Sequence, residues 1–184
     1  MAKAIFLDRD GVINRYPGDF KYVQSSKEFK FLPGVKTALN LLVKKGYKLF
    51  VISNQAGVGK GLYSQVVLDN ITATMQKALL IHGVRFDGVY YCTHREEENC
   101  ACRKPRTGLV KKALKDFAKS GKKITLKQSY FVGDTLRDIE TGRASGLKAI
   151  LIFSGKEKLK NKENWHIKPD QTFSNLREVA KAVP

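Results

Sequence analysis

Short apolar runs and amphipathic segments alternate along most of the chain. The short runs end in polar or turn-forming residues, as buried β-strands do. Such strands are predicted at 4–7, 47–53, 84–91, 129–132 and 148–153. Apolar residues that recur every three or four positions predict helices at 35–45, 64–80, 108–118, 137–145 and 176–182. The alternation of strands and helices predicts an α/β fold, a parallel sheet covered by helices on both faces.

The chain of 184 residues has no internal repeat and no break in composition. It is long enough to bury a hydrophobic core, so we expect a single domain over residues 1–184. No apolar run reaches the roughly 20 residues that span a bilayer. The first three residues lead directly into a strand and leave no room for a signal peptide. We therefore expect a cytoplasmic protein with no membrane partner.

The formal net charge is +17, from 34 basic and 17 acidic side chains. Such a balance suits anionic ligands, phosphate esters included, and it also permits nonspecific contact with nucleic acid. The lysines are spread along the chain, however, and no aromatic RNA-recognition signature accompanies them. We expect no specific nucleic-acid partner, and a solvated basic surface is the simpler interpretation of the charge.

Polar side chains follow three of the predicted strands at the point where each strand ends. Asp8 and Asp10 follow the first strand, and Ser53 ends the second. Asp134 and Asp138 follow the fourth. The carboxyl ends of parallel strands meet at one edge of a sheet, where ligands bind in α/β folds. Two carboxylates spaced by one residue repel each other, so this edge requires a metal ion, an acid–base pair, or both.

The order Asp-x-Asp-Gly, an apolar strand ending in Ser53, then Lys104 and Gly-Asp-x-x-x-Asp resembles the haloacid dehalogenase-like phosphatases. The resemblance covers nearly the whole chain. It implies a Rossmann-like parallel sheet without a large cap domain. It also implies a phosphate monoester substrate, for which catalysis is mostly positioning and charge neutralisation.

The resemblance further implies a role for each polar residue. Asp8 is expected to attack phosphorus and form an aspartyl-phosphate, and Asp10 to act as general acid and base. Ser53 and Lys104 are expected to contact the transferring phosphoryl group. The expected ligands of a Mg²⁺ ion are Asp8, the backbone carbonyl of Asp10 and Asp134, with Asp138 orienting the outer shell. Arg9 lies between the two aspartates, and strand alternation predicts that it points away from them, without a catalytic role.

All three cysteines of the chain lie within eleven residues, which argues against a disulfide framework. Cys92, His94, Cys100 and Cys102 match a closed tetrahedral Zn²⁺ site with three thiolates and one imidazole. No ligand position is left open, so we expect a structural zinc in a loop at about 92–105. The alternative is a set of reduced cysteines beside a surface histidine. A zinc-bound loop would hold the adjacent Arg103 and Lys104 in place for the substrate.

A narrower resemblance lies in the segments 8–14, 53–55 and 92–105. They are similar to those of the D-glycero-D-manno-heptose-1,7-bisphosphate 7-phosphatases. This resemblance implies a phosphorylated sugar as substrate and contacts to it from Asn54, Gln55, Arg103 and Lys104. A second phosphate on the substrate would give Arg103 and Lys60 an anion to bind.

Three alternatives remain open at the level of sequence. Histidinol-phosphate phosphatases share the same framework, and a polynucleotide 3′-phosphatase would suit the basic charge. A zinc-stabilised nucleic-acid-binding module without catalysis is the alternative of a different class, but such a module has no need of the aspartates. The lack of a large cap suits a monomer.

Overall fold

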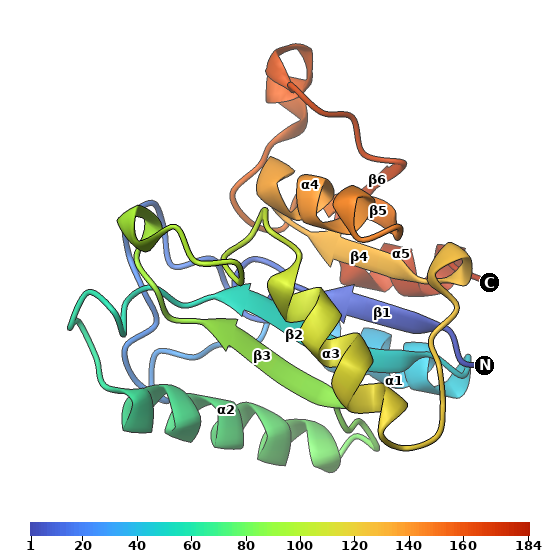
Figure 1. Ribbon diagram of the computed structural model, residues 1–184, viewed down its shortest axis with the longest axis horizontal. Coiled ribbons are helices and arrows are strands. Elements are labelled where there is room, and N and C mark those ends of the chain that lie inside the picture. The colour runs from blue at the N-terminus through green and yellow to red at the C-terminus, as the bar shows by residue number, and fades with distance from the viewer.

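The computed structural model describes residues 1–184 and contains one six-stranded sheet in which all strands are parallel, in the order β3-β2-β1-β4-β5-β6 (Figure 1). The strands are β1 (Ala4–Leu7), β2 (Lys48–Asn54), β3 (Gly88–Cys92), β4 (Tyr130–Gly133), β5 (Lys148–Ile152) and β6 (Gln171–Phe173). The helices are α1 (Val35–Lys44), α2 (Gln65–Leu80), α3 (Gly108–Ala118), α4 (Leu136–Ala144) and α5 (Leu176–Ala182). Three short 3₁₀ helices complete the chain: η1 (Glu96–Glu98), η2 (Leu126–Gln128) and η3 (Leu159–Asn164).

Helices cover both faces of the sheet, as the sequence predicts (Figure 1). Alternation along β1 shows how the two layers are built. Ile5 and Leu7 join the large core formed with α1, α2 and α5, whereas Phe6 packs on the other face against residues of α3. Burying both faces explains why the strand runs are continuously apolar.

The local signals at the helix ends agree with the structure. The Ser64 hydroxyl accepts a hydrogen bond from the backbone N–H of Val67, which caps α2. Gly46 follows α1 with a φ of +83°, a left-handed conformation that glycine adopts without steric cost. These two residues fix where the chain leaves α1 for β2 and where it enters α2.

Five of the six strands coincide with predicted ones, and two differences have a physical cause. β3 begins at Gly88 rather than at residue 84, although Val84 and Phe86 are buried in the core. The apolar run there contributes packing without joining the sheet ladder. β6 is missed by the sequence pattern because this strand has three residues and lies at the exposed edge of the sheet.

The loops that follow the strands gather at the carboxyl edge of the sheet. In Figure 1 the strand arrowheads point to the side where segments 11–34, 55–64 and 93–107 lie. β1 pairs with β2 on one side and with β4 on the other, so the chain reverses its direction of winding beside β1. Ligand sites of open α/β sheets lie at such a switch point. No helix of the protein combines the length and the apolar character needed to cross a membrane.

Candidate active site

The switch point brings together the polar residues that end β1, β2 and β4. Leu7 pairs with Val51 of β2 and with Val132 of β4, so Asp8, Ser53 and Asp134 emerge side by side. All three line one pocket together with Asp10, Asn54, Lys104 and Asp138. The structure therefore gathers the polar strand ends at one edge, as the sequence predicts.

Lys104 is the only cation inside the acidic cluster, and its side chain is 3% exposed. Its Nζ lies 2.9 Å from Oδ1 of Asp8 and 2.5 Å from Oδ1 of Asp138. Burial by itself would lower the pKa of the Lys104 ammonium, but the Asp138 and Asp8 carboxylates hold that pKa above its ordinary value. Lys104 is thus fixed as a positive charge next to the Asp8 carboxylate.

Burial raises the pKa of Asp8 to about 6, although the Lys104 charge and a hydrogen bond from Ser53 act in the opposite direction. The pKa of Asp134 is raised well above its usual range by burial and by the charges of Asp8 and Asp138. Three carboxylates against one ammonium leave an excess of negative charge within this cluster. The cluster consequently favours a bound cation.

The donor set fits a hard divalent cation. Oxygen atoms of Asp8, Asp134 and Asp138 lie within 4.8 Å of one another. Oδ1 of Asp8 is buried and accepts no hydrogen bond of proper geometry. Gly11 and Gly155 flank the Asp134 carboxylate so closely that a Cβ on either would lie about 2 Å from its Oδ2. The Lys156 N–H donates to the same oxygen at 2.7 Å, which fixes its direction.

Asp138 also begins α4. Its Oδ2 accepts hydrogen bonds from the Thr135 N–H at 3.1 Å and from the Thr135 hydroxyl at 2.6 Å, which completes a capping box. Its Oδ1 accepts from Lys104. Both oxygens of this fully buried carboxylate are therefore engaged by the protein itself, which ties the start of α4 to the buried lysine.

Asp10 lies apart from this cluster, among hydrogen-bond donors. The guanidinium of Arg9 donates hydrogen bonds to both carboxylate oxygens of Asp10, with N···O distances of 2.9 to 3.1 Å. Because Arg9, which is completely buried, pairs with Asp10, the prediction that it points away from both aspartates is wrong. The reason is that β1 ends at Leu7 and the chain then turns, with the Ile13 N–H donating to the Arg9 carbonyl at 2.8 Å.

The two amides after β2 have different surroundings. Asn54 lines the pocket and holds the backbone of Lys104 in both directions, accepting from its N–H at 3.0 Å and donating to its carbonyl at 3.1 Å. Gln55 is fully buried behind Asp10 and donates to Asp10 Oδ2 at 2.9 Å and to the Ser53 hydroxyl at 3.2 Å. Gln55 is not among the residues that line the pocket.

The four predicted zinc ligands converge after β3. The three sulfur atoms lie 3.3 to 3.5 Å apart, and Nδ1 of His94 lies 3.6 Å from the Cys92 sulfur and 3.3 Å from that of Cys102. Tetrahedral bonds of about 2.3 Å separate two sulfur ligands by about 3.8 Å. Burial raises the pKa of the Cys92 thiol, whereas hydrogen bonds from Cys102 and Cys92 lower that of Cys100 to about 7 against the effect of its own burial. The four side chains could hold one metal ion.

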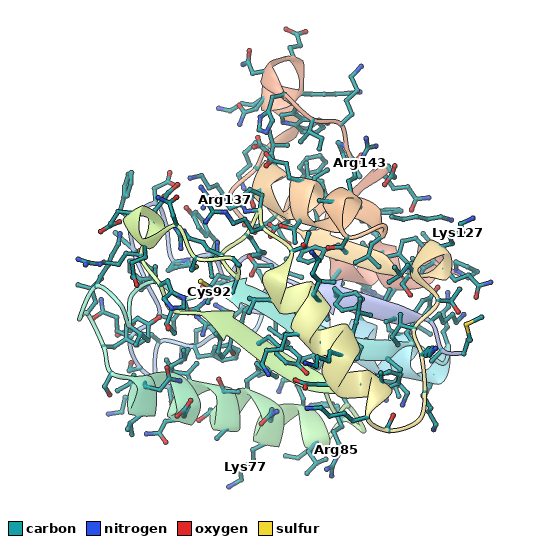
Figure 2. The ribbon with its side chains drawn as sticks, in the orientation of Figure 1. Lys77, Arg85, Cys92, Lys127, Arg137 and Arg143 are labelled. Carbon is teal, nitrogen blue, oxygen red and sulfur yellow. The ribbon has the colours of Figure 1, made fainter.

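Basic side chains from several loops surround the mouth of the pocket. Arg103 lies 3.6 Å from Glu96 of η1, and Arg137 at the beginning of α4 lies 3.8 Å from the same carboxylate. Lys60 and Lys156 also line the pocket. Figure 2 shows Cys92 and Arg137 on the side toward which the strands point, whereas Lys77, Arg85, Lys127 and Arg143 lie elsewhere on the surface. Sequence reasoning missed Arg137 and Lys156, whose only signal was a basic residue shortly after a strand end.

The parallel sheet, its strand order and the acidic cluster with a buried lysine at its carboxyl edge define a haloacid dehalogenase-like phosphatase fold. A model of the family described as polynucleotide kinase 3 phosphatase matches residues 3–180. The chain belongs to this family.

Similar proteins within this fold carry the name of a sugar bisphosphatase. The D-glycero-beta-D-manno-heptose-1,7-bisphosphate 7-phosphatase of Haemophilus influenzae is 39% identical over 163 residues, 85% of this chain and 84% of that protein. The enzyme of the same name from Helicobacter pylori strain J99 is 37% identical and covers 89% of each chain. The crystal structure of D,D-heptose 1,7-bisphosphate phosphatase from B. bronchiseptica, complexed with magnesium and phosphate, superposes with a TM-score of 0.85 at 30% identity, covering 97% of this chain and 96% of that one.

Proposed function

We propose that the protein is a Mg²⁺-dependent phosphatase that removes the 7-phosphate of D-glycero-D-manno-heptose 1,7-bisphosphate. The observation that carries the proposal is the contact between Lys104 Nζ and Asp8 Oδ1 at 2.9 Å, inside a cluster with two further carboxylates. A buried carboxylate beside a fixed cation is suited to attack phosphorus while the phosphoryl charge is neutralised. The names of the relatives support the choice of substrate.

In the proposed mechanism Asp8 attacks the phosphorus atom of the ester. The bond from phosphorus to the sugar oxygen breaks, and Asp10 gives its proton to that oxygen. Asp10 then takes a proton from a water molecule whose oxygen attacks the aspartyl-phosphate, so phosphate leaves and Asp8 is restored. Ser53 and Lys104 donate hydrogen bonds to the phosphoryl oxygens during both steps.

Mg²⁺ would be held by Asp8, Asp134 and the backbone carbonyl of Asp10, and it would supply further positive charge to the phosphoryl group. Asp138 orients Lys104 and the outer shell. Zn²⁺ would be held by Cys92, His94, Cys100 and Cys102, and because these four ligands leave no coordination position open it would serve structure alone.

The second phosphate of the substrate accounts for the basic mouth of the pocket. Arg103 has a side chain that is only 15% exposed, and its planar fork suits a phosphate dianion. Lys60, in the segment 55–64, lines the same pocket and can add a second charge. Asn54 lines the pocket and is proposed to contact the sugar. Gln55 contributes through its hydrogen bonds to Asp10 and Ser53 rather than from the pocket surface.

The test is phosphate release from a panel of substrates, with and without Mg²⁺. The panel contains heptose 1,7-bisphosphate, histidinol phosphate and an oligonucleotide with a 3′-phosphate. We expect the highest kcat/KM on the heptose bisphosphate, loss of activity on chelation of Mg²⁺, and loss in Asp8→Asn. A preference for either of the other substrates would overturn the substrate assignment, and full activity of Asp8→Asn would overturn the mechanism.

A further inference from the structure

We propose that Arg9 is a positioning residue that holds the Asp10 carboxylate at the angle from which it exchanges a proton with the substrate oxygen. The proposal rests on the proposed phosphatase function and adds to it a residue that would not touch the substrate. The surroundings of Asp8 and Asp10 differ although only one residue separates them.

The contact between Arg9 and Asp10 is a two-pronged ion pair. Nε of Arg9 donates to Oδ1 of Asp10 at 3.0 Å, and Nη2 donates to Oδ1 at 2.9 Å and to Oδ2 at 3.1 Å. Such a fork fixes the plane of a carboxylate as well as its position. The flat guanidinium in turn lies over the ring of Tyr91, 5.7 Å from its centre, so its own orientation is fixed by packing.

Two further donors complete a cage on the buried side of Asp10. The Asn14 amide donates to Oδ1 at 2.8 Å, and the Gln55 amide donates to Oδ2 at 2.9 Å. Gln55 is itself held by the Tyr63 hydroxyl, which donates to its Oε1 at 2.9 Å. The Asp10 side chain is still 18% exposed and lines the pocket, so the cage leaves one side of the carboxylate open to the substrate.

The burial of Arg9 is difficult to explain by stability alone. A buried ion pair often contributes less than apolar residues of similar volume, because both charges lose their hydration. Nη1 of Arg9 is buried and donates no hydrogen bond, which adds to that cost. Asp10 is the only acidic side chain within reach of the guanidinium. The buried ion pair therefore serves to fix one carboxylate, the one that faces the pocket, in spite of its desolvation cost.

Proton transfer depends strongly on the placement of the acid. A general acid contributes roughly 10² to 10⁴ in rate, and a misplacement of about 1 Å can cost on the order of 100-fold. The contribution is large for a sugar alkoxide, which is a poor leaving group, and small for p-nitrophenolate, which leaves without a proton. Dependence on the leaving group thus separates a positioning role from a purely structural one.

The experiment measures release of the leaving group in a single turnover with enzyme in excess, for heptose bisphosphate and for p-nitrophenyl phosphate. We expect Arg9→Met to slow release of the sugar roughly 100-fold and release of p-nitrophenol less than about threefold, with little change in the enzyme concentration that gives half the maximal rate. Arg9→Lys keeps the charge but not the fork, so it should show the same pattern with a loss of roughly tenfold. Arg143→Met, which removes an exposed arginine paired with Asp170, should leave both rates unchanged.

A double-mutant comparison connects the effect to Asp10. Asp10→Asn should show the same dependence on the leaving group, and adding Arg9→Met to it should slow sugar release little further. Equal losses of both substrates in Arg9→Met, or a full additional loss in the double mutant, would overturn the proposal. If Arg9→Met does not fold, a wild-type rate of sugar release in Arg9→Lys overturns it. The proposed function fails separately, if the wild type releases neither leaving group or if Asp8→Asn releases both.

Discussion

The acidic cluster at the sheet edge and the cysteine loop after β3 are built by different means, although they meet at Lys104. Asp8 and Asp134 directly follow hydrogen-bonded strands, and Asp138 lies in the first turn of α4. Asp134 and Asp138 are almost completely buried, with 1% and 0% exposure. The loop at 93–107 contains only η1, and His94 is exposed. The sheet therefore positions the first region, and we infer that a metal ion bound by the cysteines and His94 would fix the second.

Lys104 lies at the end of the loop but has its side chain in the cluster. Its backbone is held twice by Asn54, and its ammonium is held by Asp8 and Asp138. Arg103, one residue earlier, has only a long hydrogen bond of 3.4 Å to the His94 carbonyl and the ion pair with Glu96. We infer that the sheet determines catalysis and that the loop determines substrate affinity.

The largest effect is expected from Lys104→Met, which removes the charge that the two regions share. The kcat on heptose bisphosphate should fall on the order of 10² to 10³, with a smaller change in KM, because the ammonium acts on the developing phosphoryl charge. Steady-state kinetics at saturating Mg²⁺ measure both values. Lys112→Met, an exposed lysine on α3, serves as the control. A loss of less than tenfold would show that Lys104 is only a structural counter-ion.

Gly155→Ala tests how closely the sheet edge fixes Asp134. A Cβ at this position would lie 1.9 Å from Asp134 Oδ2, so the carboxylate must move. We expect kcat to fall about 100-fold and the Mg²⁺ concentration for half activity to rise. Ser154→Ala, which only removes a hydrogen bond to the Gly11 carbonyl, should have a much smaller effect. Equal effects of the two variants would contradict a tight fit around Asp134.

Cys100→Ser affects the loop without touching the acidic cluster. The variant should lose its zinc, which metal analysis of the purified protein measures. The KM for heptose bisphosphate should rise roughly tenfold while kcat changes less, because Asn54 still holds Lys104. Glu97→Gln in the same loop is the control, since this exposed residue does not bind metal. A zinc-free variant with the KM of the wild type would separate the loop from substrate binding.

The smallest effect concerns stability. Burial raises the pKa of Asp8 from 3.8 to about 6, so the folded, metal-free protein binds that proton more tightly than the unfolded chain does. The metal-free protein should therefore lose stability as the pH rises through this range. Mg²⁺ should raise the unfolding temperature by several degrees at about pH 7.5 and less at about pH 5, where protons compete for the carboxylates. The same increase at both values, measured by thermal unfolding, would contradict Asp8 as a ligand.

The sequence predicts the region built by the sheet in most of its detail. Apolar runs that end in Asp8, Ser53 and Gly133 mark β1, β2 and β4, and parallel pairing then brings their ends together. The cysteine loop is predictable as a ligand set because all its ligands lie close in sequence. In both cases the positions of the residues along the chain are enough to predict which side chains lie together.

The remaining features depend on contacts that no spacing encodes. The hydrogen bonds from Arg9 to Asp10 require the turn after Leu7. Beyond the end of this strand, successive side chains no longer point to opposite sides. The position of Gln55 behind Asp10 depends on Tyr63, eight residues away in a loop without periodicity. Arg137 reaches the mouth of the pocket because Asp138 caps α4 beside the buried lysine. Each of these residues is placed by tertiary packing.

The most direct test of the account is to trap the phosphorylated residue. The reaction with heptose bisphosphate is stopped by acid during turnover and treated with borohydride, which reduces an aspartyl-phosphate to homoserine. Peptide sequencing by mass spectrometry then identifies the modified position. We predict homoserine at position 8 in the wild type and none in Asp8→Asn. Homoserine at another position, or no modification while the sugar product is released in a burst, would contradict Asp8 as the nucleophile.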